Sequence, residues 1–461
     1  PGRQGKFIWQ TSGKSVFESL KGKYLPEPGW LIRYRLRDGS VDERAEEYSC
    51  WVSNKGVPYV SYKLPEAKEG MTLIEENARQ LAYDAIKTTY DTDMTSLFEL
   101  EASSSKKPNR MDWFFRFKDE DENVNLSKGE CRVNVSISGD EVTNVWREVF
   151  IPEDWIRSEE EKNNKYMPFN LLMTILIAFP ILVALVVGII RWSKKEFNTS
   201  IFIKSFIFLG VLRLIVLLNS YSKMIWNFST AKPFTDQLYM AVFSGLVIQI
   251  LFMGLAGAVL VGITFKLVEE VKSNKSNWIL GVYIGLLLSG VSSTLMSLYP
   301  QMQPNIGRFQ DLNYEVAIVG GSLAYLGNFI QITLMYLIVS VGLVKFTQNW
   351  KQKIPLGMFC IALVGFFLSF NGESTFESFP IWIGSGIIIS LLVYLVHKDF
   401  LQYNLHLIPV ITATLTSLEI VKNAIINIHD GTILISIFGF ILVSILGYFW
   451  SFSILHSKKT V

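Results

Sequence analysis

Residues 171–190 read LLMTILIAFPILVALVVGII and contain no charged side chain. A bilayer core needs about 20 mostly apolar residues for each helical span, so this stretch predicts a transmembrane helix. The residues before it are rich in charge, and the sequence changes at Tyr166 and Met167 from one suited to water to one suited to lipid. The sequence therefore predicts a water-soluble N-terminal part followed by a membrane-embedded part.

Further apolar runs follow the first one along the remaining chain. The eighth run is interrupted by Glu419 and Lys422, and we retain it because the charge pattern between the runs requires it. The predicted fold class is therefore an α-helical polytopic membrane bundle of about nine spans, preceded by an α+β soluble domain. The nine predicted spans are 168–191, 201–220, 239–265, 277–298, 315–344, 354–371, 380–396, 405–427 and 431–454.

Positive charge between the predicted spans collects on one side of the membrane. The opposite side holds only Lys223, Lys232 and Arg308. Because cytoplasmic loops carry the excess of Lys and Arg, we expect residues 1–166 outside the cytoplasm and the C-terminus inside, in the cell membrane. The predicted cytoplasmic set is Arg191, Lys194, Lys195, Lys266, Lys272, Lys275, Lys345, Lys351, Lys353, Lys398, Lys458 and Lys459.

Composition excludes several functional classes. The net charge is +2, and no clustered basic patch indicates nucleic-acid binding. No GxxxxGK[ST] loop is present, which argues against an ATP-driven pump within this chain. Cys50, Cys131 and Cys360 form no CxxC pair, so a cysteine zinc site is not expected. Cys50 and Cys131 either form a disulfide outside the cytoplasm or are two separate thiols.

The soluble part alternates between strand and helix patterns. One helix is expected within 72–90, where apolar residues recur at helical spacing. A helix beside an antiparallel sheet forms an α+β domain. We expect this domain at 1–153, a charged stalk at 154–166, the bundle at 167–456 and a cytoplasmic tail at 457–461. The expected strands are 30–36, 47–53, 57–64, 96–102, 111–118, 131–138 and 142–151.

The end of the soluble part, residues 133–146, reads VNVSISGDEVTNVW, a strand, a small-residue turn and a second strand. This order of one helix followed by strands resembles a PepSY-type domain over about residues 70–150. The resemblance implies a location at the cell exterior and a role in regulating proteases. A peptide or protein is the partner that it implies.

Ionisable and amide side chains inside predicted spans are the default functional candidates of a membrane protein. Arg213 lies midway through the second span. The amides can instead join helices by hydrogen bonds, and that structural role is the favoured interpretation. The intramembrane polar residues that we single out are Arg213, Asn219, Gln249, Asn328 and Gln331.

A second group of polar residues is found late in the chain and includes Glu373, His397, His406 and Glu419. Glutamate and histidine are the groups that activate water, as bases or as metal ligands. No HExxH motif is present, and a solvated imidazole near a cytoplasmic loop is the ordinary interpretation of both histidines. Glu419 and Lys422 can also neutralise each other on one helix face. No cofactor is evident, and a metal stays open.

The layout of an exterior domain before a multi-span bundle resembles the CPBP (CAAX-protease and bacteriocin-processing) intramembrane proteases. Their motif is EExxxR, and residues 372–378 read GESTFES, in which Glu373 and Phe376 match. Glycine replaces the first glutamate and Glu377 replaces the arginine. The resemblance implies peptide hydrolysis by Glu373, His397, His406 and Glu419, or a catalytically degenerate relative of such an enzyme.

Three functions are therefore weighed. The first is a CPBP-like intramembrane endopeptidase. The second is a non-catalytic envelope sensor or scaffold, whose exterior domain binds a peptide or protein. The third and least favoured is a transporter, in which Arg213 and Glu419 would bind substrate or protons. In each case the lipid bilayer is a partner and nucleic acid is not.

Overall fold

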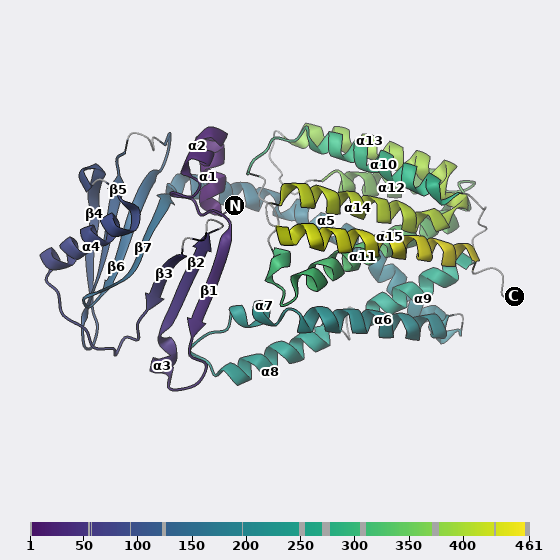
Figure 1. Cartoon of the computed structure of the whole chain (residues 1–461). Coiled ribbons are helices and arrows are strands. Elements are labelled where there is room, and N and C mark those ends of the chain that lie inside the picture. Colours follow the sequence, from purple (N-terminus) through teal and green to yellow (C-terminus); the bar gives the residue numbers. More distant parts are fainter. Residues whose placement is uncertain are drawn as a thin grey trace. The chain divides into compact units, whose positions relative to one another are not determined.

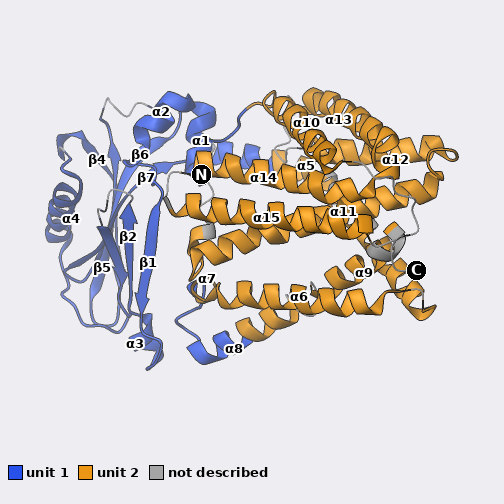
Figure 2. Ribbon diagram, turned by 45° about the vertical axis from the view of Figure 1, so that its right-hand side comes forward, with its two compact units in different colours: residues 1–161, 226–240, 301–305 blue, residues 162–225, 241–300, 306–461 orange. Residues whose placement is uncertain are grey.

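The computed structural model of the chain describes residues 2–53, 56, 58–92, 94–121, 126–195, 197–248, 254–269, 277–304, 310–370, 378–427 and 430–456. Strands occur in the N-terminal part and helices dominate the rest (Figure 1). The chain divides into two compact units (Figure 2). Unit 1 comprises Pro1–Glu161, Trp226–Met240 and Gln301–Asn305, and unit 2 comprises Lys162–Ile225, Ala241–Pro300 and Ile306–Val461.

The first sheet of unit 1 has three antiparallel strands in the order β1-β2-β3. They are β1 (Gly29–Arg35), β2 (Glu47–Ser53) and β3 (Pro58–Lys63). A short helix, α3 (Val41–Ala45), connects β1 and β2, and Ser40 and Glu43 form its capping box. Tyr34, Tyr48 and Tyr62 lie opposite one another in the register. Side chains therefore alternate between the two faces of this sheet.

The second sheet is also antiparallel, in the order β4-β5-β6-β7. Helix α4 (Glu75–Tyr90) covers one face of it (Figure 1) and buries Ala78, Ala82 and Ile86 against it. These three residues recur every four positions, which places them on one side of a helix. The predicted α+β domain is thus confirmed. The strands are β4 (Leu97–Lys106), β5 (Met111–Asp119), β6 (Glu130–Ser138) and β7 (Glu141–Phe150).

Two helices at the start of the chain were not predicted. They are α1 (Arg3–Thr11) and α2 (Gly13–Leu20). Phe7 and Leu20 are buried in the same apolar cluster as α4 and the second sheet. Both helices are short, with nine and eight residues, although each gathers its apolar residues on one side.

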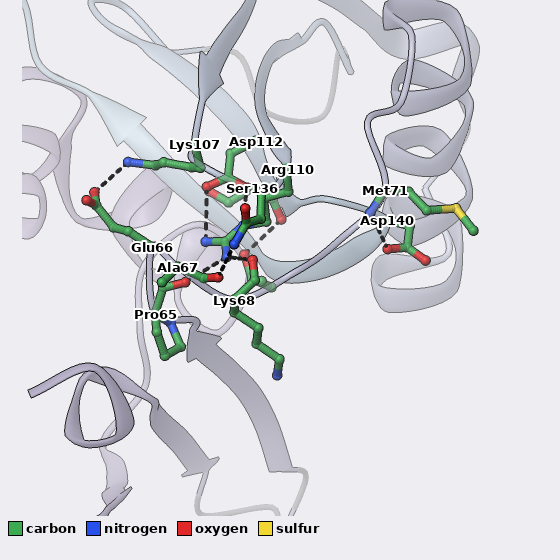
Figure 3. Close-up of polar contacts among 12 residues, drawn as sticks. Pro65, Glu66, Ala67, Lys68, Met71, Lys107, Arg110, Asp112, Ser136 and Asp140 are labelled. Atoms are coloured by element: carbon green, nitrogen blue, oxygen red, sulfur yellow. Dashed lines mark hydrogen bonds and ion pairs between the residues drawn. The ribbon is translucent and has the colours of Figure 1, made fainter. Parts of the chain in front are cut away.

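A buried arginine fixes the connection between the two sheets (Figure 3). Arg110 donates from Nη1 to the carbonyls of Pro65 and Lys68, at 2.7 and 2.8 Å. Its Nε donates to Asp112 Oδ1 at 2.7 Å, and the guanidinium is almost fully buried. Lys107 adds an ion pair to Glu66 at 2.7 Å near the surface. Because its hydrogen bonds and its charge are both satisfied, the Arg110 guanidinium can be buried without an energetic penalty for unpaired groups.

The cysteines are free thiols, and Cys50 and Cys131 lie on different sheets. The structure therefore agrees with two separate thiols rather than with a disulfide. Burial raises the pKa of the Cys131 thiol to about 12, so this thiol is protonated at neutral pH.

Helix α5 (Glu153–Ser193) joins the charged segment and the first apolar run in one continuous helix. The helices that follow belong mainly to unit 2. They are α6 (Thr199–Leu218), α7 (Tyr221–Trp226), α8 (Phe234–Gly245), α9 (Leu255–Glu269), α10 (Trp278–Met296), α11 (Ala317–Thr347), α12 (Ile354–Leu368), α13 (Phe379–Asp399), α14 (Ile408–Ile426) and α15 (Asp430–His456).

Within the described residues, six helices are long and apolar enough to cross a membrane. These are Thr199–Leu218, Trp278–Met296, Ala317–Thr347, Phe379–Tyr403, Leu405–Ile426 and Gly431–His456. The interrupted run at 405–427 is among them. These six helices agree with the predicted apolar helical bundle and are compatible with a multi-pass membrane protein.

The predicted count of nine spans is not confirmed. Of the third run, 239–265, α8 and α9 are described, and residues 249–253 between them lie outside the described part. Helix α12 has 15 residues. At 1.5 Å per residue it is about 22 Å long, which is shorter than a hydrocarbon core of about 30 Å. Sequence hydropathy reports apolar length but not where a helix begins and ends.

Small residues let the helices of unit 2 approach closely. A Cβ atom added to Gly365 on α12 would lie 2.6 Å from the Ser390 backbone on α13. A Cβ atom added to Gly447 on α15 would lie 2.5 Å from the Ala413 side chain on α14. Close backbone approach of this kind is how helices associate in lipid, where apolar burial contributes little.

Candidate functional site

The predicted catalytic residues come from separate segments of the chain. Glu373 lies outside the described residues, as do Gln249 and Glu377. His397 is in the last turn of α13, His406 is in the short 3-10 helix Leu405–Leu407, and Glu419 is on α14. Their placement is therefore considered one residue at a time.

His397 is buried, with 2% of its surface exposed, and both of its ring nitrogens have partners. Trp350 donates its indole N–H to Nδ1 at 3.1 Å, and Nε2 lies 3.3 Å from the Ser340 carbonyl. A neutral ring protonated at Nε2 satisfies both contacts. The expectation of a solvated imidazole is thus wrong for His397, because Trp350 follows α11 and covers the end of α13.

His406 is also buried, with 1% exposed, which again differs from a solvated imidazole. Val396, Leu405 and Leu407 belong to one hydrophobic cluster, so the segments that carry the two histidines meet in one region of the bundle. Burial of a neutral imidazole avoids the cost of burying a charge.

Glu419 lies far from His406 along α14. It is 11 residues beyond Ile408, the first residue of the helix, which corresponds to roughly 16 Å along the axis. Its neighbour Ile420 belongs to a different hydrophobic cluster from the segments around the histidines. The described residues therefore do not bring Glu419 and His406 within hydrogen-bond reach of each other.

Glu419 instead belongs to a polar stripe on α14. Thr412, Thr416, Glu419 and Asn423 are spaced by four, three and four residues, so they share one helix face. At one end the Thr412 hydroxyl lies 2.7 Å from that of Thr333 on α11, and at the other end Asn423 donates to the Tyr325 hydroxyl at 3.4 Å. Hydroxyl and amide pairs of this kind hold helices together in lipid.

The remaining intramembrane polar residues differ in exposure. Arg213 on α6 and Asn328 on α11 are half-buried, and Gln331 is exposed. Asn219, at the C-terminal end of α6, is buried. Its Nδ2 donates to the Val316 carbonyl at 2.9 Å, and its Oδ1 accepts from the Val316 N–H at 2.7 Å. Asn219 thus joins the end of α6 to the residue before α11.

Clusters of three or more His, Cys, Asp or Glu residues that could hold a metal ion do not occur within the described ranges. Glu373 and Glu377 lie outside these ranges.

A feature missed from sequence lies on β1. Arg33 and Arg35 lie on one face of β1, and Arg37 follows two residues after the strand ends. We call these three residues the arginine ladder. The sequence predicted only a strand at 30–36, although the alternation RYRLR at 33–37 was the signal that could have revealed the arginines.

The arginine ladder contacts residues 226–234, which we call the strap; both lie in unit 1. Arg33 and Arg35 donate to the carbonyls of Trp226 and Phe228, both 193 positions further along the chain. The equal offset means that strap and strand run parallel at these residues. The Arg33 and Arg37 guanidinium carbons also lie 5.4 and 4.6 Å from the ring centroids of Trp226 and Phe234. Each such cation–π contact contributes about 0.5–1 kcal/mol at exposed sites.

Glu47 on β2 orients the first arginine of the ladder. Its two carboxylate oxygens accept from Arg33 Nε and Nη2 at 2.5 and 2.9 Å. The hydrogen bonds from Arg33 hold the pKa of the Glu47 carboxyl below its ordinary value. Burial lowers the pKa of Arg35.

A second segment of unit 1 from late in the chain contacts α1. Trp9 donates its indole N–H to the Gln301 carbonyl at 2.8 Å, and Gln10 donates to the Met302 carbonyl at 3.1 Å. Two connections between membrane-compatible helices, 226–240 and 301–305, thus have backbone groups bound by side chains of the α+β domain.

No protein-family model matches the sequence, and no curated protein or solved structure matches it. The resemblances to CPBP proteases and to PepSY-type domains therefore stay predictions. The site has to be interpreted from its own geometry.

Proposed function

We propose that this chain is a non-catalytic sensor or scaffold of the cell membrane. Its α+β domain binds a peptide or protein outside the cytoplasm, and the strap transmits that event to the helices. The observation that carries the proposal is the contact of the arginine ladder with the strap, because the strap begins at the last residue of α7 and ends at the first residue of α8.

The proposed orientation rests on two independent observations. Charge sorting assigns the loops after the second and fourth predicted spans to the same side as residues 1–166. The segments 226–240 and 301–305 come from these two loops, and both belong to unit 1 with the α+β domain. Agreement between a charge pattern and a contact pattern supports an exterior domain and a cytoplasmic C-terminus.

The CPBP-like protease is the alternative, and the sequence resemblance is its support. It would require Glu373 to approach His397 or His406 within hydrogen-bond reach. Both ring nitrogens of His397 are engaged with Trp350 and Ser340, which favours a structural histidine. A transporter would use Arg213 and Glu419, and it stays the least favoured alternative.

The test uses the full chain in lipid nanodiscs. A library of extended ten-residue peptides is screened for binding, and amide hydrogen exchange of residues 226–240 is compared with and without the best ligand. We expect a ligand bound to the α+β domain to change exchange in the strap. In R33A/R35A the same ligand should bind with no change in the strap, whereas R132A, on the other sheet, should behave as wild type.

Two results would contradict the proposal. Failure of every peptide to bind would argue against a peptide sensor. Binding with identical exchange in the strap would show that the α+β domain does not communicate through it.

A further inference from the structure

The three-stranded sheet carries a second surface on the face opposite the arginine ladder. The residues on it are uncharged at neutral pH, and we call it the aromatic face. It consists of Trp30, Ile32 and Tyr34 on β1, Tyr48, Cys50 and Val52 on β2, and Pro58, Val60 and Tyr62 on β3. The register places these residues in three rows across the sheet, on one side of it.

This face is uncovered although it is apolar. Trp30, Tyr34 and Val60 are 45%, 60% and 54% exposed, and Ile32 and Tyr48 are also exposed. An aromatic side chain presents about 150–250 Å², so these fractions leave roughly 500 Å² of contiguous side-chain surface uncovered. Exposed apolar patches of several hundred Å² on a soluble domain mark interaction sites.

The margin of the face is polar. The Tyr48 hydroxyl donates to Glu46 at 2.7 Å, and the Tyr62 hydroxyl donates to Glu141 at 3.1 Å. Lys68 lies 3.5 Å from the same Glu46 carboxylate. An uncharged centre with a polar rim is the usual anatomy of a protein–protein interface.

We propose that the aromatic face is the contact surface between two copies of this chain. Three strands at about 4.8 Å spacing make a surface roughly 14 Å wide, which is too broad for one extended peptide and fits a second sheet stacked face to face. An uncharged face can pack on its own copy without like-charge repulsion, as a two-fold interface requires. A standard interface buries about 800 Å² on each partner, and this face with its rim supplies most of that area.

This inference does not depend on the proposed function, because the arginine ladder and the aromatic face are opposite sides of one sheet. Anchoring in a bilayer confines the copies to a plane, which raises their effective concentration. Face-to-face stacking of the two sheets therefore does not need a high intrinsic affinity.

The test measures self-association of the full chain in liposomes by energy transfer between labelled copies, as the protein-to-lipid ratio is lowered. We expect wild type to dimerise. Y34D/V60D, which puts four carboxylates into one interface, should weaken association by at least about tenfold. Y34S/V60S removes apolar area without adding charge and should weaken it less. F98D, at an exposed position on the other sheet, is the matched control and should dimerise as wild type does.

The remaining outcomes would overturn the proposal. Monomeric wild type at every protein-to-lipid ratio would do so, and so would equal association of wild type and both face variants. An environment-sensitive dye attached to Y34C distinguishes lipid from a second copy of the chain on this face. Dye emission typical of an apolar environment, without energy transfer between copies, would show that lipid covers the face. Native circular dichroism of each variant excludes loss of fold as the cause.

Discussion

Trp350 and His397 are joined by a hydrogen bond of 3.1 Å from the indole N–H to Nδ1, and both side chains are buried. Trp350 lies just after α11, and His397 lies in the last turn of α13. The ring centroids are 5.6 Å apart in an edge-to-face arrangement. The contact ties the ends of two helices together and accounts for a histidine that sequence alone suggested as catalytic.

Replacement of His397 should therefore lower stability. H397A leaves the Trp350 donor unpaired, which we expect to cost about 2 kcal/mol. W350F removes that donor, so W350F and H397A should be non-additive in a double-mutant cycle. Urea unfolding of the full chain in detergent measures each value. H456A, at an exposed position, is the control; additive effects would contradict the structural role.

The Arg110 contacts predict a strong local effect. R110A leaves the carbonyls of Pro65 and Lys68 without their donor and should destabilise the α+β domain by about 3 kcal/mol. K107A breaks only a partly exposed ion pair and should cost less than about 1 kcal/mol. Limited proteolysis should cut R110A within 65–71 first. Equal protease resistance of the two variants would argue against the role given to Arg110.

Acid should weaken the contact between Glu47 and Arg33. The folded-state pKa of Glu47 lies below its unfolded value of about 4.3, so its contribution is full above that pH and is lost as the pH falls toward the folded value. The difference in unfolding free energy between wild type and E47Q should shrink on going from about pH 6 to about pH 3. Glu76, which is largely exposed, provides the control E76Q. A difference independent of pH would refute the assignment.

The proposed orientation predicts which sites are labelled from outside the cell. In a variant without native cysteines, S104C on the exposed part of β4 should react with a membrane-impermeant maleimide in intact cells. K353C, between α11 and α12, should react only after permeabilisation. The reverse labelling pattern would show that the topology is opposite to the proposed one.

A cleavage assay separates the sensor from the protease. We expect the full chain in proteoliposomes to leave a transmembrane peptide substrate uncut, and E373Q and H406Q to be indistinguishable from wild type. Cleavage by wild type that is lost in E373Q, with unchanged unfolding, would establish the protease and reject the non-catalytic proposal.

The elements of the α+β domain could be predicted where the apolar pattern is strong. The strands found at Glu47–Ser53 and Met111–Asp119 agree with those expected to within one residue. Apolar alternation determines such strands locally. Helices α1 and α2 were not predicted, because their buried side chains pack against a sheet that lies far along the sequence.

The candidate site was less predictable for a related reason. The environment of His397 is set by Trp350, 47 positions earlier in the chain. The arginine ladder binds the carbonyls of Trp226 and Phe228, which are 193 positions from Arg33 and Arg35. Neither partner can be inferred from local spacing, because helix packing and loop docking bring them together.

The alternation of side chains along β1 has a consequence for how this chain can vary in length. Arg33 and Tyr34 are neighbours in sequence, yet one belongs to the arginine ladder and the other to the aromatic face. A single-residue deletion before them would turn every following side chain of the strand to the other side. Both surfaces would then be lost in one step, so insertions and deletions in this strand should be tolerated only in pairs.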